Sequence, residues 1–383
     1  MLGIFRGEIM TNSSETTPTK SYFIVHVDDL HAWNVFVTEQ VKNRRRRAIF
    51  RESEYCGETW IYRGQRDDRW DITSTLQREV KSVPNGIKSL EHDLRGKELS
   101  SIQSFKALAW KYVPNPNMTS LEWLTLMRHY GVPTRLVDFT ESPMIALHFA
   151  VATEPDGNFV VWALNRDRFR DAYIQSQAGT KLPGWDELFL KYGEHVMDEV
   201  RNLNTTDSMV KCAQEYLHNF ILSDATTVMR NMFNRRMADK ILNTPLTEEI
   251  DIPDRIGTIW FTPECPNPRM IAQKGLFVMP LRFSESFMES VYRTLEINHI
   301  MKDEIHLNMA KIDYLKRASS YVSIMKFVFK HEMINEVRDS LLIADCSHLS
   351  LYPDIDGVAT SVAKQVRDSL SGYVGSLCEL GLL

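Results

Sequence analysis

The densest group of side chains suited to chemistry lies between Arg128 and Ser142. This stretch reads RHYGVPTRLVDFTES and is constrained by Gly131 and Pro133. Segments anchored by rigid elements commonly carry binding groups. The structural alternative is an ion pair between Arg135 and Asp138, with Thr140 or Ser142 capping a helix. The candidate site residues are His129, Tyr130, Thr134, Arg135, Asp138, Thr140 and Ser142.

A second group of candidates is the run Tyr62-Arg63-Gly64-Gln65. The guanidinium of Arg63 presents a planar fork of donors suited to phosphate or carboxylate. Gly64 would let a ligand approach the backbone closely. The alternative is an exposed hairpin with surface ion pairs among residues 66–69. The arginine run 44–47 could likewise contact phosphates or simply end a helix.

Gln273 is a third candidate. It follows Arg269 and enters a predicted strand, so its amide could face a cleft. Otherwise it is an ordinary polar residue at a strand edge.

Sequence periodicity predicts the elements that must position these groups. Thr119 and Glu122 form a capping box that begins a helix ending at Gly131, and Ser142-Pro143 begins another. Between these helices, residues 132–141 are predicted as a loop. Strands are expected at 22–27, 59–65, 158–164, 256–261 and 275–280. Further helices are expected at 28–41, 89–112, 208–222, 227–241, 322–342 and 357–370.

This pattern predicts an α+β fold, with a central mixed β-sheet flanked by many helices and a helical insertion at about 166–245. Residues 1–20 are polar and predict a disordered lead. Residues 21–58 are expected to form a strand–helix extension, 59–366 the main domain and 367–383 a C-terminal tail.

Bulk properties narrow the classes of function. The net charge of −5 argues against electrostatic coating of nucleic acid, although a local basic groove is compatible with it. The five scattered cysteines form no CxxC pair, so we expect a reducing compartment and no metal. No apolar run suits a signal peptide or a membrane span, which predicts a cytoplasmic protein without a membrane. Without GxGxxG, GxxxxGKS or HExxH motifs, Rossmann, P-loop and zinc-protease chemistries lack support.

Together the motifs resemble the FRG domain, a bacterial and phage family named for its Phe/Tyr-Arg-Gly motif. That motif is Tyr62-Arg63-Gly64-Gln65 here, and the most specific stretch is RHYGVPTRLVDFTESPMIALHFA. Weaker similarity lies in NPRMIAQKGLF and in LYPDIDGVA, which contains a Pro-Asp-x-x-Gly turn. The resemblance covers about residues 59–366.

The resemblance also implies a layout similar to ADP-ribosyltransferases. Those enzymes place an Arg or His on an early strand, a Ser/Thr segment before an Ala/Phe-rich helix, and a late strand with Glu or Gln. Arg63, Asp138 and Gln273 are then the expected catalytic residues. NAD is the expected co-substrate, bound by Tyr62, Gly64, Gln65 and the candidates of the 128–142 stretch.

Gln273 departs from the usual late Glu, and an amide cannot act as a general base. Asp138, Glu141 or Glu264 would then act instead, or the site would bind without transferring. Whether the chain is an enzyme is thus left open. The leading hypothesis is an ADP-ribosyltransferase-like toxin or anti-phage effector that modifies a nucleic acid or protein and has a cognate antitoxin. The alternatives are a non-enzymatic nucleotide or nucleic-acid binding module and a metal-free hydrolase or nuclease using His129 and Asp138.

Overall fold

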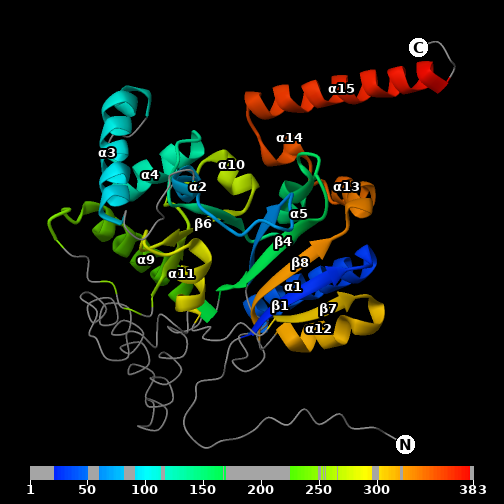
Figure 1. Cartoon of the computed structure of the whole chain (residues 1–383), viewed down its shortest axis with the longest axis horizontal. Coiled ribbons are helices and arrows are strands. Elements are labelled where there is room, and N and C mark those ends of the chain that lie inside the picture. Colours follow the sequence, from blue (N-terminus) through cyan, green and yellow to red (C-terminus); the bar gives the residue numbers. More distant parts are fainter. Residues whose placement is uncertain are drawn as a thin grey trace, which may run out of the picture.

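The computed structural model describes residues 21–50, 60–81, 91–113, 117–166, 168–169, 225–248, 252, 254, 256–264, 266–295, 302–319 and 322–379 (Figure 1). The predicted disordered lead at 1–20 and the predicted helix at 208–222 therefore lie outside the described residues. None of the helices in the described part combines the length and apolar character that a membrane crossing requires.

One mixed sheet of eight strands organises the described chain, in the order β5-β6-β3-β2-β4-β8-β1-β7. Strand β1 pairs in parallel with β7 and β8, and the other neighbours are antiparallel. The strands are β1 (Ser21–Val27), β2 (Trp60–Gln65), β3 (Val137–Thr140), β4 (Phe159–Asn165), β5 (Thr258–Phe261), β6 (Gly275–Pro280), β7 (Lys302–Leu307) and β8 (Val322–Phe329). The predicted α+β class, with a central mixed sheet and many helices, is confirmed.

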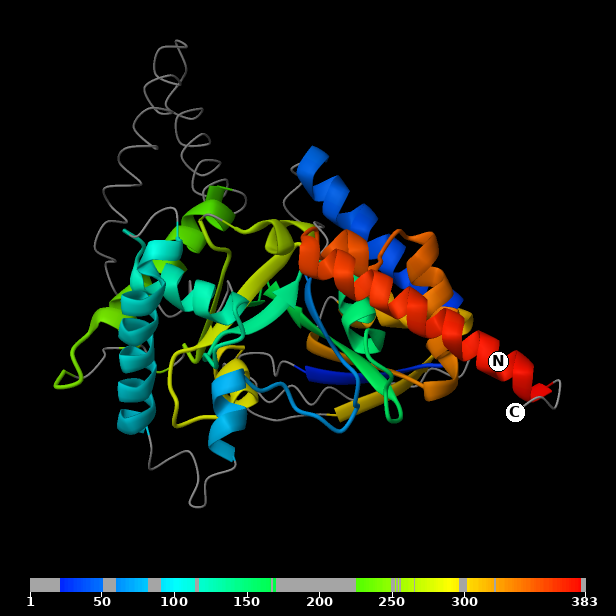
Figure 2. The same ribbon diagram turned by 90° about the horizontal axis from the view of Figure 1, so that it is seen from above.

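Helices surround this sheet on both faces (Figures 1 and 2). They are α1 (Leu30–Phe50), α2 (Thr75–Lys81), α3 (Glu91–Ala109), α4 (Ser120–His129), α5 (Pro143–Val151), α9 (Ala225–Asn243), α10 (Pro268–Ala272), α11 (Phe287–Thr294), α12 (Ile312–Ser319), α13 (Ile334–Ile343), α14 (His348–Leu351) and α15 (Ile355–Glu379). The predicted capping box of α4 forms as expected, and so does the Ser142 cap of α5. Helix α15 continues well past the predicted end at residue 370.

Side chains alternate between the faces of the sheet and enter separate cores. On β6, Leu276 and Val278 pack with α11, whereas Phe277 and Met279 pack with α3, α4 and α9. Tyr62 of β2 is in register with Thr140 of β3, and Thr140 is in register with Gly275 of β6, so Tyr62 lies on the same face of the sheet as Phe277. Tyr62 nevertheless packs in a different core, that of α1, α5 and α13. Two helix groups therefore cover one face of the sheet, and they meet over β2, β3 and β6.

The helix predicted over 322–342 is wrong in its first half. Residues 322–329 form β8, and α13 follows from Ile334. Strand β8 lies between β4 and β1 and is buried on both faces: Ile324 and Val328 enter one core, Phe327 and Phe329 the other. Because both of its faces are buried, β8 lacks the regular apolar–polar alternation of a half-buried strand, and periodicity cannot distinguish such a stretch from a buried helix.

The loop predicted over 132–141 is also wrong in part, because Val137–Thr140 is strand β3. Its four residues alternate apolar and polar, but the strand is held by β6, which is distant in sequence. Short strands stabilised by distant partners give little local signal. The consequence for the site is that Asp138 and Thr140 lie on the sheet itself.

Candidate functional site

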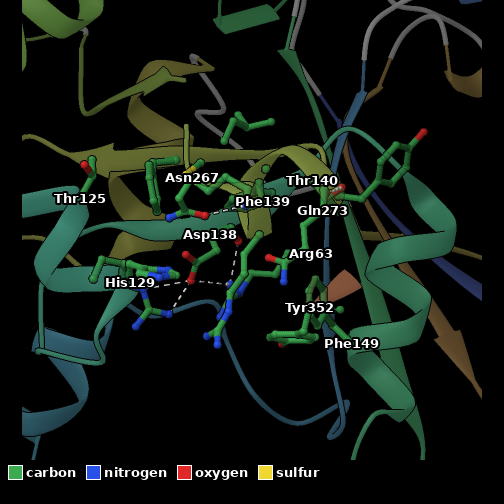
Figure 3. Close-up of a pocket in the computed structure, with 18 of the residues that line it drawn as sticks. Arg63, Thr125, His129, Asp138, Phe139, Thr140, Phe149, Asn267, Gln273 and Tyr352 are labelled. Atoms are coloured by element: carbon green, nitrogen blue, oxygen red, sulfur yellow. Dashed lines mark hydrogen bonds and ion pairs between the residues drawn. The ribbon is translucent and has the colours of Figure 1, made fainter. Parts of the chain in front are cut away.

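A pocket of about 380 Å³ lies where the two helix groups meet over the sheet (Figure 3). Its floor comes from β2, β3 and β6, and its walls from α4, α5, α10 and the residue after α14. This volume falls within the range of about 300–1,000 Å³ that is typical of ligand sites. The lining residues with polar or charged side chains are Tyr62, Arg63, Thr125, Arg128, His129, Asp138, Thr140, Asn267, Arg269, Gln273 and Tyr352.

Strands β2 and β3 are joined at one registered residue pair, Tyr62 with Thr140. Beyond this pair the side chain of Arg63 bridges the two strands. Its Nη1 donates a 2.7 Å hydrogen bond to the main-chain oxygen of Asp138 and lies 3.9 Å from the carboxylate of Asp138. The early arginine and the aspartate of β3 are therefore neighbours in one pocket.

Arg128, in the last turn of α4, holds the Asp138 carboxylate. Its Nε donates to Oδ2 at 3.0 Å, and its Nη2 contacts the same oxygen. The Asp138 side chain is still 46% exposed, so the carboxylate faces the pocket rather than the core. Two guanidinium groups thus surround one accessible carboxylate.

The charges of the lining favour an anionic ligand. Arg63 and Arg128 contribute two positive charges against the one negative charge of Asp138, whereas Arg269 is paired with Asp354 and Asp356. Burial lowers the pKa of Arg63 to about 10; Asp138 opposes this shift, and the cations Arg128 and Arg78 add to it. The buried Nε of Arg63 has no hydrogen-bond partner among the described residues.

One wall of the pocket is a clasp between α10 and the start of α15. Arg269 forms ion pairs with Asp354 and with Asp356, the latter at 3.2 Å, and its guanidinium lies 5.4 Å from the Tyr352 ring centroid. Hydrogen bonds from Arg269 and from the Gly357 amide lower the pKa of Asp354 to about 2. The clasp keeps Tyr352 at the pocket.

His129 lies near this clasp. Burial is the main cause that lowers the pKa of His129, and the cation Arg269 adds to it, while Asp354 opposes. The neutral imidazole is therefore favoured at pH 7. No hydrogen bond joins the His129 ring to the Asp138 carboxylate in the structure, so the two do not form a hydrogen-bonded acid–base pair.

Gln273 is the residue after α10. The prediction that it enters the following strand is wrong, because β6 begins only at Gly275. Its side-chain Nε2 donates to the Leu351 carbonyl at 3.2 Å, and its main-chain oxygen accepts a 2.7 Å hydrogen bond from Thr140. Gln273 thus links β3 and α14 across the pocket, with its amide already engaged.

The structure brings together seven of the residues that sequence reasoning selected. These are Tyr62, Arg63, Gly64, His129, Asp138, Thr140 and Gln273. Gly64 has a packing role as well, because a Cβ there would lie 1.8 Å from the Ala146 carbonyl of α5. Its glycine is required for α5 to pack directly on β2.

Five other selected residues do not line the pocket. Gln65 is buried and accepts a hydrogen bond from the indole of Trp162. Thr134 is buried, with its main chain bound to Thr75. Tyr130 is exposed to solvent and Ser142 caps α5.

The fifth, Arg135, is buried and pairs with Glu98 of α3, with Nη2 at 2.5 Å from Oε2. Its guanidinium also lies 3.9 Å from the Phe283 ring centroid. The alternative ion pair between Arg135 and Asp138 is therefore wrong, since each has another partner. The sequence alone does not reveal whether an arginine near a strand faces a cleft or the core.

The other acidic candidates also lie outside the pocket lining. Glu141 pairs with Arg166 at 2.5 Å, and Glu264 pairs with Arg235 at 3.1 Å. Asp138 is thus the carboxylate of the proposed set that reaches the pocket.

Sequence reasoning did not select Arg128, Arg269, Tyr352, Phe149 or Asn267 as site residues, although all line the pocket. Arg128 directly precedes His129 and is the first residue of the stretch RHYGVPTRLVDFTESPMIALHFA. The signal for Tyr352 was its position before the Pro-Asp turn. Asn267 caps α10 by accepting from the Met270 amide at 2.9 Å, a local role that sequence spacing could have indicated.

Comparison with known families agrees with the motif. Residues 58–158 match the model of the FRG domain, so this segment of the chain is an FRG domain. It contains β2, α2, α3, α4, β3 and α5, whereas Arg269, Gln273 and Tyr352 lie outside the match. No curated protein and no solved structure matches the chain.

Proposed function

We propose that the pocket binds NAD in the cytoplasm and that the chain is an ADP-ribosyltransferase-like effector of the toxin or anti-phage type. One observation carries this proposal: Arg63 and Asp138 meet in one positively charged pocket beside Thr140 and Gln273. The strands that bear or adjoin these residues, β2, β3 and β6, are neighbours in the sheet. That arrangement is consistent with the layout that the resemblance implies.

The pyrophosphate of NAD would lie against the guanidinium groups. Arg63 and Arg128 would supply the positive charge that faces it. The lining also includes the aromatic side chains of Tyr62, Phe149 and Tyr352, and their ring faces would stack on nicotinamide or adenine.

The proposed reaction breaks the bond between C1′ of the ribose and the nicotinamide nitrogen. Nicotinamide leaves with the electron pair, and positive charge develops on C1′ and the ring oxygen. The Asp138 carboxylate would stabilise this oxocarbenium ion. An acceptor nucleophile then bonds to C1′ and releases its proton, and water in that place would give free ADP-ribose.

A second candidate function is nucleotide binding without transfer. It is favoured by the engaged state of the two proposed catalytic groups: Asp138 is held by Arg128, and the amide of Gln273 is bound to Leu351. A carboxylate already neutralised by a guanidinium stabilises a developing cation less well.

The test measures nicotinamide release from NAD by the purified full chain and, in parallel, NAD binding by calorimetry. Asp138→Asn should lower turnover by about 100- to 1,000-fold while the chain still binds NAD, because one well-placed group supplies that much stabilisation. Arg63→Gln should weaken binding. Matched controls are Asp339→Asn and Arg236→Gln, which change exposed residues on α13 and α9.

The outcomes separate the two functions. NAD binding that depends on Arg63, without turnover in any variant, would exclude the transferase and support nucleotide binding without transfer. Turnover that is equally low in the unaltered chain and in both pocket variants, together with an absence of NAD binding, would exclude both functions.

A further inference from the structure

A patch of exposed apolar side chains lies at the end of α3 and in the 3-10 turn that follows, Trp110–Tyr112. Leu108 is 75% exposed, Trp110 58% and Tyr112 77%. Helix α3 stands at the opposite side of the described fold from α12 (Figure 1). We name Lys106, Leu108, Trp110, Lys111 and Tyr112 the α3-end patch.

The patch is held on a packed scaffold. Phe105 and Ala109 of the same helix turn inward against the core of α4 and α9, and the Phe105 and Trp123 ring centroids are 6.2 Å apart. The end of α3 is therefore anchored on one side, and the 3-10 turn that follows it exposes two large rings. Exposed large apolar groups gathered on a rigid element are typical of binding surfaces.

The charge of the patch is positive. Lys106 and Lys111 are exposed, and the Nζ of Lys111 lies 5.0 Å from the Tyr112 ring centroid. The sequence contains no Asp or Glu between Glu98 and Glu122. The acidic groups at the nearby start of α4 are engaged in capping it: Glu122 accepts from the Thr119 amide, and Asp239 from the Leu121 amide.

We propose that the α3-end patch binds single-stranded nucleic acid. Unpaired bases would stack on Trp110 and Tyr112, and Lys106 and Lys111 would contact the phosphates. Lysine is depleted in protein–protein interfaces, so the combination of lysines and rings favours a nucleic acid over a protein partner. In a duplex the paired bases are stacked on each other and would not reach the rings.

This binding surface is independent of the pocket. If the proposed function also holds, the patch identifies the acceptor class as nucleic acid, and that step rests on the proposed function. Failure of NAD turnover would leave oligonucleotide binding intact, so the two proposals can fail separately.

The experiment measures fluorescence anisotropy of labelled oligo(dT) and oligo(rU) strands of about 12 nucleotides, a length that an open binding surface can occupy. Binding by the full chain should weaken with salt, with a log–log slope of about −1.4 for two phosphate contacts. Trp110→Ala and Tyr112→Ala should each lower affinity at least about fivefold. Exchanging both lysines for glutamine should bring the slope close to zero.

Tyr314→Ala is the matched control, because it removes an exposed ring on α12. It should leave oligonucleotide affinity unchanged. Absence of binding at low salt, or equal binding by the Trp110 and Tyr112 variants, would overturn the proposal. So would a fall in thermal stability of the ring variants without any oligonucleotide binding, since it would mean that protein covers the rings.

Discussion

Arg63 and Arg135 are both largely buried arginines near the central sheet, but their partners differ. Arg63 contacts a main-chain oxygen and an accessible carboxylate, and its Nε has no partner among the described residues. Arg135 is paired with the buried Glu98. The first arrangement leaves donors for a ligand, and the second consumes them.

Arg135→Ala should therefore destabilise the fold by about 3–5 kcal/mol, because Glu98 would be left buried without its cation. Denaturant unfolding measures this loss. NAD affinity of the folded protein should not change. Replacing both residues, Arg135 by Met and Glu98 by Gln, should recover part of the stability; a weaker NAD affinity with unchanged unfolding would contradict the assignment.

His129 should make anion binding depend on pH. A lowered pKa means that the neutral imidazole is favoured in the folded protein, so protonation occurs only as the pH falls below the usual value of about 6.5. The affinity for NAD, whose pyrophosphate charge is constant in this range, should be flat from pH 8 to 7 and rise in acid. His129→Gln should abolish the rise. An affinity that rises equally in the variant would exclude His129 as the cause.

At the scale of elements, the sequence correctly predicted the helix starts that are stabilised by residues close together in the chain. The capping box at Thr119 and Glu122 and the Ser142-Pro143 start of α5 are both present. Strands β3 and β8 were missed, because each is defined by distant neighbours in the sheet.

The same reasoning explains the site. Arg63, Asp138, His129 and Gln273 were predicted from three separate segments of the sequence, and all line the pocket. The contributions of Arg269 and Tyr352 depend on α10 and α14 meeting β3, a packing that no local pattern encodes. Arg135 was selected because sequence alone does not reveal that α3 supplies Glu98 as its partner.

At the scale of the molecule, β1 is an internal strand of the sheet, next to the edge strand β7. Residues 21–58 were interpreted as an extension of the main domain, yet β1 lies between β8 and β7 and pairs with both. Val25 of β1 and Trp33 of α1 are fully buried in the core. The FRG segment at 58–158 therefore shares its sheet with strands from both ends of the described chain.

Deleting residues 1–50 should abolish cooperative unfolding, because β7 and β8 would lose the strand between them and the core would lose Trp33. Circular dichroism during a thermal ramp would detect this. Deleting residues 1–20 is the matched control, since it leaves β1 intact, and it should preserve the transition. A cooperative transition in the longer deletion would show that β1 is dispensable.

The position of β1 also sets the order of events during synthesis. Tyr22 pairs with Lys302, so the partners lie 280 positions apart in the sequence. At about 5–20 residues per second, the ribosome needs roughly 15–60 s to make that intervening stretch. Strand β1 is therefore made well before either of its partners, and the sheet can close only after β7 and β8 have been synthesised.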